Sequence, residues 1–267
     1  MRDVFGGDKN PSGMMATFGA RPGAEERYKA NCCDNVKLAM VTFTTTREAI
    51  KQVLPYPLEP ALDVPPTVAA LLWDASDSFR GWDGVNRPYQ ELGLWLPAKF
   101  RNTVGLHLFH LYMDGPGGYA AAICGREAFG TTKELGTVQV VHDGDVVRCT
   151  AGQLGVPRIT ITADCPNNVP RGESPLALTA NALFVKEIPN CTFTGYDVRK
   201  VISASWGFFG QMTKSIKIGT GTISLGAPLD VLKVVEMGPA YRIVTDAPPT
   251  TVFEGYKELA DLLKSES

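Results

Sequence analysis

Short stretches in which apolar and polar residues alternate recur along most of the chain, and they predict strands. In 158–164, Ile159 and Ile161 alternate with threonines, as expected for a strand with one buried face. The stretch 137–151 predicts a hairpin, because Asp143 and Gly144 can adopt the positive φ angles of a tight turn between two β runs. Further strands are predicted over 36–46, 66–73, 89–96, 104–113, 215–226 and 240–246.

Helical patterns are fewer. A short helix is predicted after Thr45, because Thr45 and Glu48 have the spacing of a capping box and Pro55 ends the segment. Three more helices are predicted, over 119–129, 229–235 and 251–264. Many strands, few helices and no repeated βαβ spacing favour a mostly β fold, either an antiparallel barrel or a sandwich.

The chain favours one domain with flexible ends. Residues 1–30 are rich in Gly, Pro, Ser and charge without periodicity, and they predict a flexible N-terminal arm. The remainder, 31–267, has no internal repeat and no linker-like stretch, so it is predicted to form a single domain. The chain has 267 residues, of which 44% are hydrophobic and 20% charged, a composition typical of a globular protein with a sizeable core.

Charge and cysteine usage argue against several partners and compartments. The net charge is −2 and the basic residues are scattered, so we expect no nucleic-acid partner and no anionic membrane surface. The N-terminal stretch lacks the apolar core of a signal peptide, and no apolar stretch of about eighteen residues follows it. Six cysteines at irregular spacing, without a C-x-x-C pair, predict reduced thiols and a cytoplasmic protein.

Motifs for nucleotide and metal chemistry are absent from the sequence. There is no G-x-G-x-x-G after a strand, no Walker lysine loop and no G-x-S-x-G elbow. His107 and His110 lie three positions apart on a predicted strand, so their side chains are expected on opposite faces and not at one metal. We therefore expect no cofactor and no metal, which leaves lysine chemistry as the main candidate.

The stretch "GREAFGTTKELG", residues 125–136, resembles the signature of the acetoacetate decarboxylase-like superfamily. In that signature, a Gly-Arg-Glu, a flexible linker and a Lys-x-Leu-Gly run carry a Schiff-base lysine, and the lysine at the matching position of this chain is Lys133. The stretches "VTFTTTREAIKQVLPYPLEP" (41–60) and "PYQELGLWLP" (88–97) resemble the family's early strand, helix and turn and its Tyr-x-Glu strand. The resemblance extends over roughly 36–248, nearly a whole domain.

The resemblance implies a cone-like antiparallel β-barrel with a few flanking helices, a central pocket and a homo-oligomer. It also implies that Lys133 attacks a ketone carbonyl and forms an imine that accepts electrons. An amine attacks only when it is neutral, and burial in an apolar pocket favours the neutral form of a lysine. Glu91 matches a pocket carboxylate of the family, which implies a role as proton donor or acceptor and orienter beside Lys133.

Other residues are candidates for the pocket wall. The predicted substrate-binding residues are Arg126, Phe129, Tyr89, Trp73 and Leu71. Arg126 and Glu127 belong to the signature, and a buried ion pair that holds a helix in place is their alternative role. The large aromatic residues, Trp206 among them, could equally serve packing. Tyr89 and Tyr112 are candidate proton donors near the imine, with a structural hydroxyl as the alternative.

Two departures from the family pattern change the expected substrate. Glu134 stands where the decarboxylases have a second lysine, and it is expected to point away from Lys133 because adjacent side chains diverge. The family's early arginine is lost or replaced by Lys37, and a glutamate is replaced by an apolar residue near Leu71. The pocket should therefore suit a larger and more apolar carbonyl substrate than acetoacetate.

Three functions are open at this point. The first is a cofactor-independent lyase that decarboxylates a β-keto acid or a related carbonyl substrate through a Schiff base on Lys133. The second is an aldol, dehydratase or cyclisation-type enzyme that acts on a larger polyketide-like intermediate in secondary metabolism. The third is a non-catalytic barrel that binds a hydrophobic ligand. Each of them has a small-molecule partner.

Overall fold

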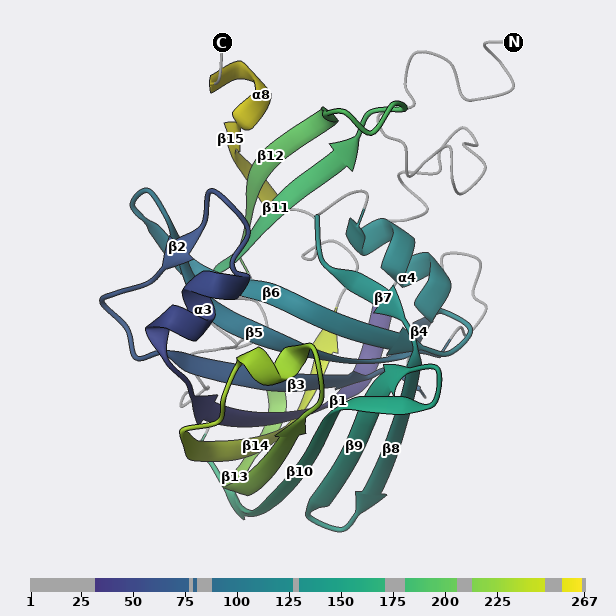
Figure 1. The fold of residues 1–267 in the computed structure, drawn as a ribbon. Coiled ribbons are helices and arrows are strands. Elements are labelled where there is room, and N and C mark those ends of the chain that lie inside the picture. Colours follow the sequence, from purple (N-terminus) through teal and green to yellow (C-terminus); the bar gives the residue numbers. More distant parts are fainter. Residues whose placement is uncertain are drawn as a thin grey trace.

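The structure is a computed structural model that describes residues 32–76, 79–80, 88–126, 130–170, 181–205, 213–247 and 256–265. The arm predicted over 1–30 lies outside these residues. The described residues form one sheet of fifteen strands, with a few short helices (Figure 1). The prediction of a mostly β fold with few helices is confirmed.

The strands and the hairpin expected from the sequence are all present. They are β1 (Cys32–Thr44), β3 (Thr67–Asp74), β5 (Gln90–Phe100), β6 (Thr103–Asp114), β8 (Thr137–Asp143), β9 (Val146–Gln153), β10 (Val156–Asn168), β13 (Thr213–Leu225) and β14 (Glu236–Ala247). The β8–β9 hairpin turns at Gly144, whose φ of 58° is the left-handed conformation that glycine adopts without strain. Strands not expected from the alternation are β2 (Glu59–Pro60), β4 (Phe79–Arg80), β7 (Lys133–Leu135), β11 (Asn181–Pro189), β12 (Tyr196–Ser205) and β15 (Tyr256–Asp261).

The order of the strands shows where the sheet is interrupted. Neighbours are joined in the order β15-β12-β11-β6-β5-β3-β1-β14-β13-β10-β9-β8, and β7 pairs with β6 in parallel. Within the described ranges, β8 has a ladder with β9 alone, and no ladder closes the sheet onto β6. The expected cone-like antiparallel β-barrel thus corresponds to a mixed, largely antiparallel sheet, and in the part of the chain that the structure describes no ladder closes it into a barrel.

Short contacts take the place of a ladder between β6 and β8. β7 leads into β8 through Gly136, whose N–H donates to Met113 O at 2.9 Å. Val138 N–H then donates to Asp114 Oδ2 at 3.0 Å. One backbone hydrogen bond and one side chain thus hold the start of β8 against the end of β6, because the parallel pairing of β7 stops after three residues.

The main core lies inside the curve of the sheet. The sheet curves until β8 and β9 contact β5 and β6 (Figure 1). Alternate residues of β1, β3 and β5 point into this core, namely Ala39, Val41, Phe43, Val68, Ala70, Leu72, Leu92, Leu94 and Leu96. They meet side chains of β9 and β10, namely Val147, Cys149, Ala151, Ile159, Ile161 and Ala163. Every second residue of these strands is buried in this core, which is the alternation of apolar residues that predicts the strands from the sequence.

The opposite face of β1, β3, β5 and β6 is packed against α4 (Gly118–Cys124), β11 and β12. This second cluster includes Met40, Ala69, Trp95, Leu108, Leu111, Met113, Ala122, Ala182, Phe184, Ile202 and Ala204. The rings of Trp95 and Phe184 meet edge to face, with 6.3 Å between centroids. The sheet is therefore apolar on both faces in this region, and the second face carries the site described below.

Three helix predictions require correction, and the first concerns the cap of a helix that is present. The helix α3 (Arg47–Val53) is capped by Thr46, whose hydroxyl accepts a hydrogen bond from Ala49 N–H at 3.1 Å. The expected cap, Thr45, is instead buried, with 4% of its surface exposed. In the stretch 229–235, only the short 3-10 helix η4 (Leu229–Val231) forms. The helix expected over 119–129 corresponds to α4, and residues 127–129 lie outside the described part.

The helix predicted over 251–264 is wrong for residues 256–261 and agrees with the structure only at its end, from Leu262. Residues 256–261 form β15, which pairs with β12, and α8 (Leu262–Ser265) follows. The ladder is irregular at Leu259, so Leu259 and its neighbour Ala260 both pack against the cluster that contains Val201. A bulged strand therefore has the apolar spacing that we interpreted as a helical stripe.

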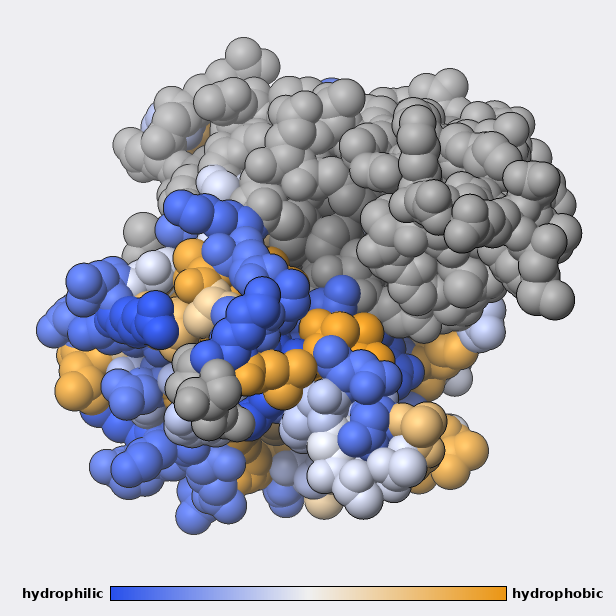
Figure 2. Space-filling view, turned by 90° about the horizontal axis from the view of Figure 1, so that it is seen from above, coloured by the Kyte–Doolittle hydropathy of each residue, from blue (hydrophilic) through white to orange (hydrophobic). Residues whose placement is uncertain are grey.

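The surface of the described residues carries scattered apolar groups. Figure 2 shows a mostly hydrophilic face with separate hydrophobic patches. Exposed large apolar side chains include Tyr56, Leu62, Leu154 and Phe193. Single exposed apolar residues are common on protein surfaces and do not indicate a partner by themselves. None of the helices in the described ranges has the length and apolar character needed to cross a membrane.

Candidate active site

The two residues predicted to be catalytic, Lys133 and Glu91, are in direct contact. Lys133 begins β7 and Glu91 lies near the start of β5, and Lys133 Nζ donates to Glu91 Oε2 at 3.0 Å. Their side chains are 15% and 14% exposed, so the ion pair is largely shielded from water. At this distance, a proton can pass between the amine and the carboxylate without a large movement of either side chain.

The strand register explains why these two side chains meet. Lys133 lies opposite Leu111 on β6, and Leu111 lies opposite Gly93 on β5. Glu91 precedes Gly93 by two positions, so it points to the same face of the sheet as Lys133. Gly93 is required by close packing, because a Cβ there would lie 2.8 Å from His110 O and 2.9 Å from Leu111 Cβ.

Three of the predicted substrate-binding residues lie on the same face as Glu91. Trp73 on β3 is paired with Glu91, and Leu71 is paired with Gly93. Tyr89 precedes Glu91 by two positions, just before β5 begins. All three are partly buried and pack against apolar clusters on this face. The ion pair therefore lies beside apolar and aromatic side chains that remain partly accessible.

Tyr241 belongs to this face as well, although the sequence did not single it out. It lies on β14 opposite Met40 of β1, and Met40 lies opposite Leu71. Burial raises the pKa of Tyr241, so its hydroxyl keeps its proton at ordinary pH. The strand predicted over 240–246 contains Tyr241, but its pairing with β1 could not be deduced from the alternation.

The remaining predicted site residues are less well placed. Arg126 follows α4 and is exposed, which does not agree with a buried ion pair at this position. Its expected partner Glu127 and the predicted pocket residues Phe129 and Trp206 lie outside the described residues. A role of Arg126 or Phe129 in substrate binding stays a prediction.

The end of α4 packs against the side chain of Lys133. Gly125 follows α4, and its N–H donates to the carbonyls of Ala121 and Ala122. A Cβ at Gly125 would lie 2.6 Å from Lys133 Cδ and 2.8 Å from Lys133 Cε, which is closer than real side chains approach. A residue without a side chain is therefore needed where the helix meets the lysine stem. Close packing against Lys133 thus explains why the signature begins with a glycine, Gly125.

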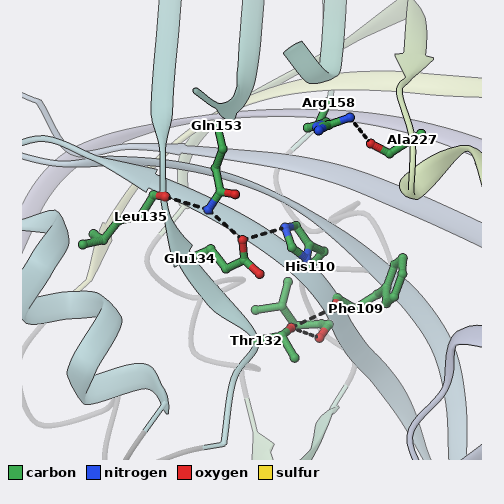
Figure 3. Close-up of polar contacts among 9 residues, drawn as sticks. Phe109, His110, Thr132, Glu134, Leu135, Gln153, Arg158 and Ala227 are labelled. Atoms are coloured by element: carbon green, nitrogen blue, oxygen red, sulfur yellow. Dashed lines mark hydrogen bonds and ion pairs between the residues drawn. The ribbon is translucent and has the colours of Figure 1, made fainter. Parts of the chain in front are cut away.

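The segment before β7 is fixed by hydrogen bonds to its surroundings. Thr131 N–H donates to Gly125 O at 3.0 Å, which ties the segment to the end of α4. Thr132 Oγ1 lies 2.7 Å from Leu108 O and 2.9 Å from Phe109 O, to which it donates (Figure 3). These contacts hold the start of β7 against β6 and so fix the backbone position of Lys133.

Glu134 reaches a different set of partners from Lys133. Gln153 Nε2 donates to Glu134 Oε2 at 2.8 Å and to Leu135 O at 3.0 Å (Figure 3). Glu134 Oε2 also lies 3.8 Å from His110 Nε2. The expected divergence of Glu134 from Lys133 agrees with these contacts, since successive residues of a strand point to opposite faces.

His110 and Tyr112 lie on the Glu134 side of β6, with their ring centroids 4.5 Å apart. Burial lowers the pKa of His110, and the charge of Glu134 opposes this shift. Burial also raises the pKa of Tyr112, and the charge of Glu134 adds to the effect. Because Tyr112 packs into the main core, it lies on the other face of β6 from Lys133. The interpretation of Tyr112 as a proton donor to the imine is therefore wrong.

The histidines and other potential ligands do not assemble a metal site in the described part of the chain. No group of three or more His, Cys, Asp or Glu side chains there could hold a metal ion. His107 is buried, and its Nδ1 lies 2.9 Å from Leu183 O. Burial lowers the pKa of His107 to about 4, although the contact with Leu183 O opposes the shift. His107 is thus a neutral residue of the interior.

Comparison with known families and proteins gives a consistent result. A family model described as acetoacetate decarboxylase (ADC) matches residues 16–256. A curated relative, "Acetoacetate decarboxylase 3" from Mesorhizobium japonicum (strain LMG 29417 / CECT 9101 / MAFF 303099), is 32% identical over 152 residues. That match covers 57% of this chain and 55% of the relative, so it spans only about half the length of the relative.

Solved structures share the fold over most of the chain. A structure of acetoacetate decarboxylase has a TM-score of 0.71 and 22% identity, covering 88% of this chain and 91% of the other. The enduracididine biosynthesis enzyme MppR, complexed with the condensation product of pyruvate and imidazole 4-carboxaldehyde, has a TM-score of 0.67 and 13% identity. The match covers 91% of this chain and 95% of the MppR chain. At these identities, the likeness concerns the fold alone.

Proposed function

The chain belongs to the acetoacetate decarboxylase family, and we propose that it is a cofactor-independent lyase that forms a Schiff base between Lys133 and the ketone carbonyl of a β-keto acid. The observation that carries this proposal is the 3.0 Å contact between Lys133 Nζ and Glu91 Oε2 in a largely buried position. A buried amine next to a carboxylate has both the nucleophile and the proton acceptor that imine formation needs. Homo-oligomeric assembly and a cytoplasmic location remain predictions.

The proposed reaction uses Lys133 as the nucleophile and Glu91 as the group that accepts and returns protons. Glu91 accepts a proton from the ammonium of Lys133, and the neutral amine adds to the carbonyl carbon while the C=O electron pair moves to oxygen. Glu91 returns this proton to the oxygen and takes one from the nitrogen, which gives the carbinolamine. The hydroxyl then leaves as water with a proton from Glu91, and an iminium remains. The bond to the carboxylate then breaks, carbon dioxide leaves, and the electron pair forms an enamine. Protonation at carbon and hydrolysis by water release the ketone and Lys133.

A second candidate is an aldol, dehydratase or cyclisation-type reaction at the same lysine. It is favoured by Leu71, an apolar residue on the site face where the resemblance places a glutamate, and by the aromatic neighbours Trp73 and Tyr89. A less polar wall suits a larger carbonyl compound. MppR, a protein of the same fold, is complexed with the condensation product of pyruvate and imidazole 4-carboxaldehyde, a ligand of the class that this candidate reaction would form.

The experiment that tests the proposal is borohydride trapping followed by intact-protein mass. The wild type, Lys133→Met and the control Lys51→Met, which removes an exposed lysine of α3, are each treated with β-keto acids and enones. The proposal expects a reduced adduct on the wild type and on Lys51→Met, and none on Lys133→Met. Carbon dioxide release distinguishes a decarboxylase from an aldolase or cyclase. Ligand binding without any adduct would support the non-catalytic alternative and overturn the proposal.

A further inference from the structure

The hydroxyl of Thr131 is buried without a partner. Thr131 is 7% exposed, and its Oγ1 makes no hydrogen bond to any residue that the structure describes. The backbone of Thr131 is satisfied, since its N–H donates to Gly125 O and its carbonyl accepts from Lys133 N–H, both at 3.0 Å. Buried hydroxyls are nearly always hydrogen-bonded, because leaving one unpaired costs free energy. The backbone groups of Thr131 thus have partners, whereas the burial of its hydroxyl without a described partner needs an explanation.

The position of this hydroxyl connects it with Lys133. A Cβ added at Gly125 would lie 2.5 Å from Thr131 Oγ1, 2.6 Å from Lys133 Cδ and 2.8 Å from Lys133 Cε. The hydroxyl and the outer part of the lysine stem thus flank the same point. Thr131 is β-branched, so it has few rotamers to choose from in a packed position. A buried donor is consequently held beside the end of the side chain that carries the amine.

Resting on the proposed function, we propose that Thr131 Oγ1 binds the oxygen of the substrate carbonyl while Lys133 attacks it. When the C–N bond forms, the C=O electron pair moves to oxygen, and a fixed hydrogen-bond donor stabilises the charge that develops there. Thr131 donates a hydrogen bond and keeps its own proton. The amine proton goes to Glu91, from which the oxygen of the carbinolamine can be protonated.

The division of roles follows from the contacts of the resting site. Glu91 Oε2 already accepts the hydrogen bond of Lys133 Nζ and takes the amine proton, so it is engaged at the nitrogen while the carbonyl oxygen still needs a donor of its own. A threonine hydroxyl is neutral and can donate at any protonation state of Glu91. The substrate oxygen would satisfy the hydroxyl that has no partner among the described residues of the free protein. Thr131 is then a catalytic residue, since it touches the reacting carbonyl.

The test compares Thr131→Val, which removes the hydroxyl and keeps the shape, with Thr131→Ser, which keeps the hydroxyl. The rate of borohydride-trappable adduct formation is measured with acetoacetate and benzoylacetate as probes, together with kcat and KM. We expect Thr131→Val to slow adduct formation by about 100-fold, and Thr131→Ser to stay within a few-fold of the wild type. Thr45→Val is the matched control, because Thr45 Oγ1 is also buried without a described partner but lies at the start of α3.

Each other outcome has a definite meaning. A wild-type rate for Thr131→Val overturns the role of Thr131 and leaves the Schiff base of Lys133 intact. Equal losses in the valine and serine variants, with a lowered melting temperature, also overturn it and assign Thr131 to packing. If the wild type forms no adduct with either probe while Lys133→Met behaves identically, the Schiff-base function fails, and the proposed role of Thr131 fails with it.

Discussion

Lys133 and Glu134 are adjacent on β7, yet they engage opposite sides of the sheet. Lys133 Nζ donates to Glu91 at 3.0 Å, whereas Glu134 Oε2 accepts from Gln153 Nε2 at 2.8 Å and lies 3.8 Å from His110 Nε2. The carboxylate that follows the lysine in sequence is therefore not the carboxylate that serves it. Glu91, forty-two positions away in the chain, takes that place because β5, β6 and β7 are neighbours.

This relationship predicts opposite results for two carboxylate substitutions. Glu91→Gln should lower kcat by about 10²–10⁴-fold, because it removes the proton acceptor next to Lys133. Glu134→Gln should change kcat by no more than about two-fold, as expected for a residue outside the machinery that retains an oxygen for Gln153. Steady-state kinetics with the best trapped substrate measures both. Similar losses in the two variants would contradict the assignment of Glu91.

The contact between Gly125 and Lys133 predicts the effect of one methyl group. In Gly125→Ala, the new Cβ would meet Lys133 Cδ at 2.6 Å, so the lysine stem or α4 must shift. Since a displacement of about 1 Å can cost about 100-fold in rate, we expect a loss of that order in trapped adduct per unit time. Gly195→Ala is the control, because its Cβ would meet only Asn190 Nδ2, at 3.4 Å. Wild-type trapping by Gly125→Ala would show that the contact does not position Lys133.

The buried histidine of β6 predicts a pH dependence of stability. His107 has a folded pKa of about 4 and an ordinary value of 6.5, so the unfolded chain binds more protons between these values. The free energy of unfolding should therefore fall as the pH drops from about 6.5 towards 4, by up to about 1.4 kcal/mol per unit. His107→Asn, whose amide can still donate to Leu183 O, should flatten this slope in urea unfolding between pH 7 and pH 5. Both proteins retain His110, so a slope that is unchanged would count against His107 as its source.

The cap of α3 predicts different costs for two neighbouring threonines. Thr46→Ala removes the acceptor of Ala49 N–H and should lower the free energy of unfolding by about 1 kcal/mol. Thr45→Val removes a buried hydroxyl without a described partner and should be neutral or stabilising. Thermal unfolding of the two variants decides between Thr46, which the structure identifies as the cap, and Thr45, which the sequence spacing favoured. A larger loss in Thr45→Val would restore the original interpretation.

The strands that the sequence predicts well are those with one buried face. In β10, Ile159, Ile161 and Ala163 alternate with more exposed residues, and this alternation is visible in the sequence. β11 shows no alternation because both of its faces are buried. Ala182 and Phe184 pack in one apolar cluster, and Leu183 and Val185 pack in another, so all four positions are apolar. β7 is too short for any period to appear. The burial of β11 on both faces and the pairing of the short strand β7 depend on tertiary contacts, and a local pattern of apolar residues does not reveal them.

The site was predictable only in part, and for a related reason. Lys133 and Glu91 follow from the resemblance to a family signature, and the register then explains how they meet. Thr131 and Tyr241 carry no local signal, since the interest of each depends on its neighbours: Gly125 and Lys133 for Thr131, and Met40 for Tyr241. These neighbours are set by the docking of α4 and by the pairing of β1 with β14. Contacts of this kind must be read from three-dimensional structure.

The placement of Lys133 on β7 has a dynamic consequence. β7 meets β6 through three register pairs and ends before Gly136, so the proposed nucleophile lies on a short strand at the interruption of the sheet. Brief unpairing of so few residues is the kind of local fluctuation that leaves long ladders intact. Such an opening would withdraw the amine from Glu91 without unfolding the protein. The proposed activity would then depend on a smaller cooperative unit than the fold does, and we expect it to be lost first under mild denaturing conditions.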